Sequence, residues 1–201
     1  MKIVFFGDSI TEAGRNFADP RDLGAGYVKI AAGKLRLMYP EEEIVLLNRG
    51  VGGDRTAELL LRVEKDIVAE QPDIVVLQVG VNDVWCRFAL GTIVSLEEFR
   101  ENYETLVEKI GGAGAKIICV LPFVLDMGDK KRFNPYVSAF NGIIRDIAAK
   151  HALPLVPLDE IFTGVTQDIA PAKFATDGIH PTHRGCRYLA DLVIKELKKM
   201  L

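Results

Sequence analysis

The sequence predicts an α/β protein, a three-layer α/β/α sandwich around five parallel strands, and three observations support this fold. Short apolar runs that end in glycine or proline alternate with longer segments of helical period. Residues 73–79 form an apolar run without alternation, so both faces of that strand must be covered. The chain has 201 residues, 49% of them hydrophobic, which is enough to bury one core. We therefore expect a single domain over residues 1–201.

Two strands that flank a helix are predicted in the first part of the chain. Residues 3–6 are apolar, lead into a glycine and form the first strand. Residues 26–39 form a helix that Pro40 ends, because proline lacks the backbone donor that a helix needs. Residues 44–48 form the second strand.

A strongly amphipathic helix is predicted over residues 56–70. Leu59, Val63 and Ile67 recur at four-residue spacing on one face, and charged residues fill the opposite face. Pro72 follows as a helix stop. The apolar strand over residues 73–79 comes next, and it belongs at the centre of the sheet because both of its faces are covered.

After the central strand the sequence predicts a helix over residues 96–110, and beyond it two strands and two helices. Ser95 is placed to cap that helix, over residues 96–110, and two glycines at 111 and 112 end it. The later elements are a strand at 116–121, a helix over 133–150, a strand at 155–156 and a helix over 184–200.

Composition and charge exclude several classes of protein. The net charge of -3 comes from 25 basic and 28 acidic residues mixed along the chain, so no basic face is available for nucleic acid. No apolar stretch has membrane-spanning length, and the first strand begins too early to leave room for a signal peptide. Cys86, Cys119 and Cys186 are an odd number with no CxxC spacing, which favours a reducing compartment. We expect a cytoplasmic protein.

Residues suited to catalysis follow three predicted strands in turn. Ser9 follows the first strand, Gly53 the second and Asn82 the third, while Asp177 and His180 lie in the loop before the last helix. Because ligands of open α/β sheets bind beyond the carboxyl ends of the strands, we expect these residues to share one site.

The residue types at that edge suit acyl transfer. A serine hydroxyl needs a neutral imidazole to accept its proton and a carboxylate to orient that imidazole, and His180 and Asp177 supply both. Gly53 allows close approach of the backbone, so that its N–H and that of Ser9 can bind an oxyanion together with the Asn82 amide. Activity should fall as His180 becomes protonated.

Four segments carry a resemblance to a known family. They are Gly7–Ile10, Gly50–Asp54, Gly80–Asp83 and Asp177–Pro181, and in this order they resemble the four blocks of GDSL-type serine esterases, the SGNH hydrolase superfamily. The resemblance implies a flavodoxin-like fold, no cofactor and no metal. It also implies that Ser9 is the nucleophile and completes a triad with Asp177 and His180. The implied oxyanion hole comprises the Ser9 backbone, Gly53 and Asn82.

Three further stretches are similar to carbohydrate deacetylases of the acetylxylan esterase type. They are Gly7–Arg15, Gly24–Tyr27 and Asn82–Trp85. This similarity implies a small-molecule ester substrate, an acetylated saccharide, and association of copies into a homo-oligomer. A lysophospholipase or thioesterase of the same superfamily is the main alternative, and its rate should rise with acyl chain length.

Substrate-binding residues are expected in the loops around the site. Asp8, Trp85 and Phe123 are the candidates, and Trp85 or Phe123 would favour a short acyl group by closing the floor of the pocket. Packing within the loops is the alternative for both aromatic residues. For Asp8 and Asp83 the alternative is hydrogen bonding to neighbouring backbone amides.

Two rival interpretations use the same residues. Asp177, His180 and His183 lie at three-residue spacing and could bind zinc, although Pro181 disfavours a continuous helix and zinc would leave Ser9, Gly53 and Asn82 unexplained. A non-catalytic carbohydrate-binding module would require the site to have lost a member, and none is missing.

Overall fold

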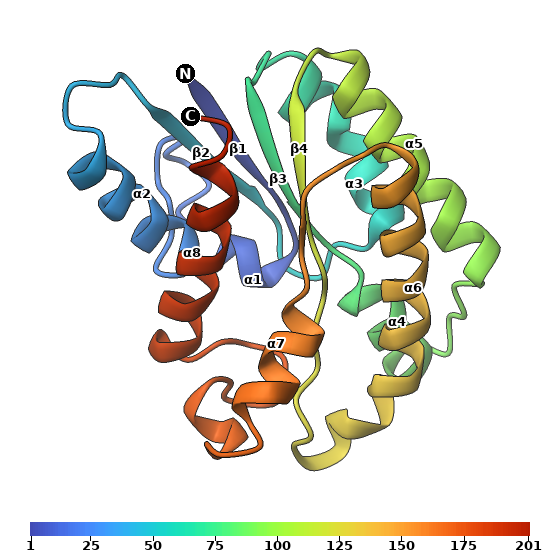
Figure 1. Ribbon diagram of the computed structural model, residues 1–201. Helices are drawn as coiled ribbons and strands as arrows, with labels where there is room; N and C mark the ends of the chain where they lie inside the picture. The colour runs from blue at the N-terminus through green and yellow to red at the C-terminus, as the bar shows by residue number, and fades with distance from the viewer.

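The protein is built on one parallel sheet of five strands, and the computed structural model describes all residues, 1–201 (Figure 1). The strand order is β2-β1-β3-β4-β5. The strands are β1 (Lys2–Gly7), β2 (Val45–Gly50), β3 (Ile74–Gln78), β4 (Lys116–Val120) and β5 (Leu155–Val156). The order reverses at β1, whose neighbours are β2 on one side and β3 on the other. Such a reversal opens a crevice at the carboxyl ends of the strands, where ligands bind in folds of this type.

Helices cover both faces of the sheet. Figure 1 shows one layer containing α1, α2 and α8 and a second layer containing α3, α5 and α6. The first layer spans α1 (Ser9–Glu12), α2 (Tyr27–Met38) and α8 (His183–Leu197). The second spans α3 (Thr56–Val63), which continues as the π-helical turn η1 (Glu64–Val68), and α5 (Leu96–Gly112) and α6 (Asn134–Lys150). The remaining elements are α4 (Val81–Ala89), α7 (Leu158–Val165) and the 3-10 turns η2 (Gly128–Phe133) and η3 (Pro171–Lys173).

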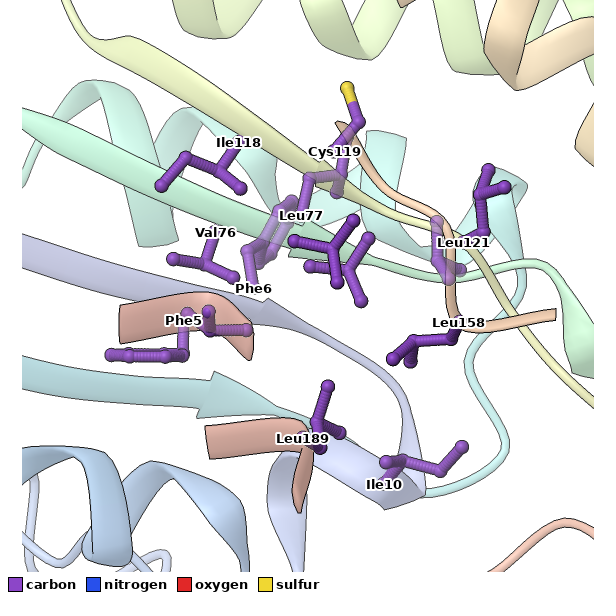
Figure 2. Packing of buried hydrophobic residues seen from close by; sticks show 14 of the residues in the cluster. Phe5, Phe6, Ile10, Val76, Leu77, Ile118, Cys119, Leu121, Leu158 and Leu189 are labelled. Atoms are coloured by element: carbon purple, nitrogen blue, oxygen red, sulfur yellow. The ribbon is translucent and has the colours of Figure 1, made fainter. Parts of the chain in front are cut away.

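The core lies on both faces of the central strands. Every residue of β3 is buried, which explains the lack of alternation in its sequence. Figure 2 shows side chains of β1, β3 and β4 packed together with Leu158 of α7 and Leu189 of α8. None of the helices combines the length and apolar composition that a membrane span needs.

The predicted α/β fold and its five parallel strands are confirmed. Several helices end at residues other than those predicted. The helix predicted over 56–70 is α-helical only to Val63, after which the backbone widens into a π-helical turn. The helix predicted to end at 110 runs on through Gly111 and Gly112, and Gly114, at φ +85°, follows its end. Three helices, α1, α4 and α7, were not predicted. The first two carry residues of the candidate site.

Candidate active site

Ser9 is presented by a sharp turn at the end of β1. It is the first residue of α1, directly after the N-cap Asp8. The Asp8 Oδ1 atom accepts a hydrogen bond from the Ile10 N–H at 3.0 Å, which fixes the start of this short helix. Ser9 therefore lies at a helix N-terminus, where exposed backbone N–H groups and the helix dipole favour negative charge.

His180 joins Ser9 to Asp177 through its two ring nitrogens. The Ser9 Oγ atom lies 3.1 Å from His180 Nε2, and His180 Nδ1 lies 2.9 Å from Asp177 Oδ2. The structure thus brings together three side chains separated by up to 171 positions in the sequence. In this arrangement Nε2 can accept the serine proton while Nδ1–H is held by the carboxylate.

The turn that contains Asp177 is organised by its own carboxylate. Asp177 Oδ1 accepts hydrogen bonds from the backbone N–H groups of His180, at 2.8 Å, and Ile179, at 3.0 Å. Burial acts to raise the pKa of Asp177, but these two bonds and the contact with the His180 ring outweigh it and lower the pKa to about 2. The carboxylate is therefore ionised throughout the neutral range.

The glycine block after β2 lies against the turn that carries Ser9. A Cβ atom on Gly50 would lie 2.2 Å from the Glu12 backbone nitrogen, so no larger residue fits between β2 and α1. A Cβ atom on Gly52 would be 3.8 Å from the Ser9 Cβ atom. Gly53 has φ +85°, a left-handed conformation that glycine adopts without steric cost. These close approaches pack the glycine block against the turn that carries Ser9.

Asn82 is held next to the glycine block by hydrogen bonds between the two loops. Its Nδ2 atom donates to the Asp54 carbonyl oxygen at 3.0 Å, which leaves its second N–H free. The neighbouring Asp83 accepts from the Thr56 Oγ1 atom at 2.6 Å and from the Thr56 N–H at 3.2 Å. The N-terminus of α4 is thereby joined to the N-terminus of α3.

Two carboxyl groups are buried beneath the site. Burial raises the pKa of Asp8 to about 7, and the charges of Asp83 and Asp54 act in the same direction. Burial also raises the pKa of Asp83 to about 7, although the two hydrogen bonds from Thr56 partly oppose it. The Asp8 Oδ2 atom has no hydrogen-bond partner in the protein. Both side chains bind backbone amides, as the alternative interpretation of the sequence proposed.

Arg62 connects the ends of β1 and β2, and the sequence analysis did not identify it. Its guanidinium donates to the Gly7 carbonyl at 3.0 Å and to the Arg49 carbonyl at 2.7 Å. It also donates through Nε to Asp54 Oδ2 at 2.7 Å, so one side chain holds both strand ends and the residue that positions Asn82. In the sequence Arg62 lies on the charged face of an amphipathic helix, as surface arginines commonly do, so no local signal marks its role.

The three candidate substrate-binding residues are placed very differently. Asp8 is fully buried and Phe123 is 1% exposed, with its ring packed 4.5 Å from the Phe162 ring. Burial removes both from the surface that a substrate can touch, which corrects that expectation. Trp85 lies one helical turn after Asn82 on α4 and is 37% exposed.

The geometry of the histidines does not favour the zinc interpretation. Both ring nitrogens of His180 are engaged, one with Asp177 and one with Ser9. His183 is the first residue of α8, after the N-cap Thr182, and contributes to no cluster of three metal-ligating side chains. Thr182 Oγ1 accepts from the Gly185 N–H at 3.2 Å, so this segment begins a helix.

The sequence matches the GDSL-like Lipase/Acylhydrolase family over residues 5–188. The chain belongs to this family. It is 30% identical to an acetylxylan esterase of Geobacillus stearothermophilus, in an alignment that covers 98% of this chain and 93% of that protein. It is 26% identical to esterase TesA of Pseudomonas aeruginosa, over 99% of this chain and 89% of the relative. The chain is therefore a serine ester hydrolase.

Solved structures of this family agree with the fold. The crystal structure of Axe2, an acetylxylan esterase from Geobacillus stearothermophilus, superposes with a TM-score of 0.90 at 30% identity, covering 98% of this chain and 93% of that chain. Catalytic mutants of Axe2 with a serine, an aspartate or a histidine replaced by alanine have also been solved. LAE5, an α/β hydrolase from the metagenome of Lake Arreo, gives a TM-score of 0.89 at 28% identity, covering 96% and 93% of the two chains.

Proposed function

We propose that this hydrolase removes an acetyl group from a hydroxyl of a saccharide through a Ser9 acyl-enzyme. The continuous hydrogen-bonded path from Ser9 Oγ through His180 to Asp177 is the observation that carries the proposal. His180 would accept the serine proton as Ser9 attacks the ester carbonyl, and then give that proton to the departing sugar hydroxyl. A water activated by the same imidazole would then release acetate and restore the serine.

The oxyanion would be bound by three donors from three loops. We assign them to the backbone N–H groups of Ser9 and Gly53 and to the free N–H of the Asn82 amide. The support is the close approach of the glycine block to Ser9 and the hydrogen bond that holds Asn82 to Asp54. Each such donor contributes about 2.7–4 kcal/mol of transition-state stabilisation in serine hydrolases.

The exposure of the triad supports a short acyl group on a polar alcohol. The side chains of Asp177 and His180 are 40% and 51% exposed, so the site is open. Cavities of about 470 and 410 Å³ are lined mainly by polar residues, and none of the three triad residues lines either of them. A long acyl chain needs an extended apolar channel, whereas an acetyl group needs little enclosure and leaves the sugar in contact with solvent. Trp85, exposed on α4 one turn after Asn82, would offer an aromatic face to such a sugar.

A substrate panel tests the proposal directly. Initial rates of wild type and Ser9→Ala should be compared on acetylated saccharides and on acetyl, octanoyl and palmitoyl esters of one alcohol. We expect rates to fall as the acyl chain lengthens and to vanish in Ser9→Ala, with labelling of Ser9 by an active-site phosphonate. A rate that rises with chain length would favour a lysophospholipase or thioesterase. If the phosphonate does not label Ser9 and the protein still binds sugars, the result would favour a non-catalytic carbohydrate-binding module.

Location and cofactor use are part of the same proposal. Cys86, Cys119 and Cys186 are all free and buried, which suits a reducing compartment such as the cytoplasm. The proposed steps use only side chains and water, so activity should survive dialysis against a chelator. Cell fractionation tests the location, and loss of activity in chelator would contradict the metal-free scheme.

We also propose that copies of the chain associate. Leu37 of α2, Leu61 of α3 and Leu90 at the end of α4 are 84%, 85% and 69% exposed, and these are apolar side chains that an interface between copies would cover. Light scattering coupled to size-exclusion chromatography measures the mass in solution, and a mass of 22.2 kDa would contradict association.

A further inference from the structure

Arg15 lies beside the glycine block without a charged partner. Its Nε atom donates to the Gly50 carbonyl at 2.9 Å, and its guanidinium lies 4.1 Å from the centre of the Phe17 ring. Arg15 is half-buried and takes part in no ion pair. Its two terminal nitrogens make no hydrogen bond within the protein, so they remain available in the fork geometry that matches a carboxylate.

Arg15 opens onto a cavity of about 410 Å³ in which cations outnumber anions. Four basic side chains, Arg15, Arg49, Arg62 and Lys65, line it, against two acidic ones, Asp66 and Glu70. Both acids are already engaged, since Asp66 accepts from Arg62 at 2.7 Å and Glu70 from Arg49 at 2.7 Å. The positive charges of Arg15 and Lys65 therefore have no counterpart within the cavity.

The electrostatics around Arg15 agree with this count. Burial lowers the pKa of Arg15, and the charges of Arg49 and Arg62 lower it further, more than Asp66 and Glu12 raise it. A bound anion would remove this repulsion and replace the missing counter-charge. The chain as a whole carries a net charge of -3, so this basic cavity stands out from the rest of the molecule.

The cavity adjoins the candidate active site through the glycine block. Val51 lines the cavity, and the next residue, Gly52, approaches Ser9 so closely that an added Cβ atom would lie 3.8 Å from the Ser9 Cβ atom. Gly7, two residues before Ser9, is bound by Arg62 of the cavity wall. The glycine block therefore forms part of the cavity wall at Val51 and part of the surroundings of Ser9 at the next residue.

We propose that Arg15, flanked by Arg49 and Lys65, forms a subsite for the carboxylate of an acidic sugar unit in the substrate. The inference rests on the proposed function, and it narrows the substrate class from acetylated saccharides to acetylated saccharides that carry a uronic acid. Arg15 would act as a specificity residue through a two-pronged hydrogen bond to the carboxylate, without a part in the bond-breaking steps.

A matched pair of substrates tests the subsite. One is a neutral acetylated oligosaccharide, and the other is the same compound with a glucuronate unit. The wild type should show a higher kcat/KM for the acidic compound, and Arg15→Gln should raise KM for that compound about tenfold or more, with little change on the neutral one. For the acidic compound, the KM of Arg15→Lys should lie between those of wild type and Arg15→Gln, because lysine keeps the positive charge but cannot form the two-pronged hydrogen bond. Arg21→Gln removes an exposed arginine outside this cavity and is the matched control.

The outcomes separate this inference from the proposed function. Equal losses on both substrates in Arg15→Gln would mean that Arg15 only supports Gly50, and would overturn the subsite. Equal wild-type rates on the two substrates would overturn it as well, while leaving the deacetylase proposal intact. Calorimetry with the two deacetylated saccharides measures binding without hydrolysis. We expect wild type to bind the acidic saccharide more tightly than the neutral one, and Arg15→Gln to bind the two equally. Inhibition by inorganic phosphate, without a preference for glucuronate, would overturn the assignment to a sugar acid.

Discussion

The Asn82 side-chain amide donates a hydrogen bond to the backbone carbonyl of Asp54 at 3.0 Å. One of its two N–H groups is thus used to fix the amide, and in the proposed oxyanion hole the other would bind the reacting oxygen. A donor held in this way needs no reorganisation when negative charge develops, which is the property that makes an oxyanion hole effective.

Asn82→Ala should lower kcat by about 10²–10³ with little change in KM, because the amide stabilises the transition state more than the bound ester. Steady-state kinetics on a soluble acetyl ester measure both constants. Asn82→Asp is the informative companion, since it keeps the shape but puts an acceptor where a donor is needed. Near-normal kcat in either variant would contradict the assigned role.

Asp177→Asn should lower kcat by about 10³–10⁴ while the turn survives. The asparagine oxygen can still accept from the backbone N–H groups of Ile179 and His180, but its NH₂ group then faces His180 Nδ1 and favours the wrong tautomer. Circular dichroism should show an unchanged fold. A loss of less than tenfold in kcat would mean that His180 does not depend on this carboxylate.

Arg62→Gln should destabilise the protein by about 3 kcal/mol and lower kcat. The substitution leaves Asp54, whose side chain is 11% exposed, without its cation and frees the carbonyls of Gly7 and Arg49. Chemical denaturation measures the free energy of unfolding. Arg100→Gln is the matched control, because its pair with Asp146 is exposed and should contribute less than about 1 kcal/mol. Equal effects of the two substitutions would refute the role of Arg62.

The buried Asp8 carboxyl should make stability depend on pH in an identifiable way. Burial raises its pKa from the model-compound value of 3.8 to about 7, so between these values the folded protein holds a proton that the unfolded chain releases. This contribution to the free energy of unfolding is lost as pH rises from about 4 to about 7. Asp8→Asn keeps the acceptor for the Ile10 N–H and cannot ionise.

The stability difference between Asp8→Asn and wild type should therefore grow in favour of the variant over that pH range, by up to about 1.4 kcal/mol per pH unit. Denaturation at closely spaced pH values measures it, with the exposed Asp168→Asn as control. A difference that does not vary with pH would show that Asp8 keeps the same protonation state in the folded and unfolded chains.

The parts of the structure that follow from local pattern were predictable. The apolar runs define all five strands, and the order of reactive residues after those strands placed Ser9, Gly53 and Asn82 at one edge. The helix α4 was not foreseen, because Asn82 and Asp83 near its start are typical turn residues. Whether residues 1–201 fold as one independent domain stays a prediction.

Features that depend on packing between distant segments could not be predicted. Phe123 follows a strand and resembles a loop aromatic, yet three-dimensional packing against Phe162 buries it. Arg62 looks like part of the polar face of an amphipathic helix, and only the tertiary fold brings it under the ends of two strands. Local periodicity carries no information about such contacts.

The serine comes from the start of the chain and the imidazole from near its end, and α8, which follows the imidazole, packs against α2. During synthesis, a ribosome must therefore release the chain beyond His180 before an ester can be cleaved. Copies that stop before residue 180 would keep the serine, lack its proton acceptor and be inert toward esters.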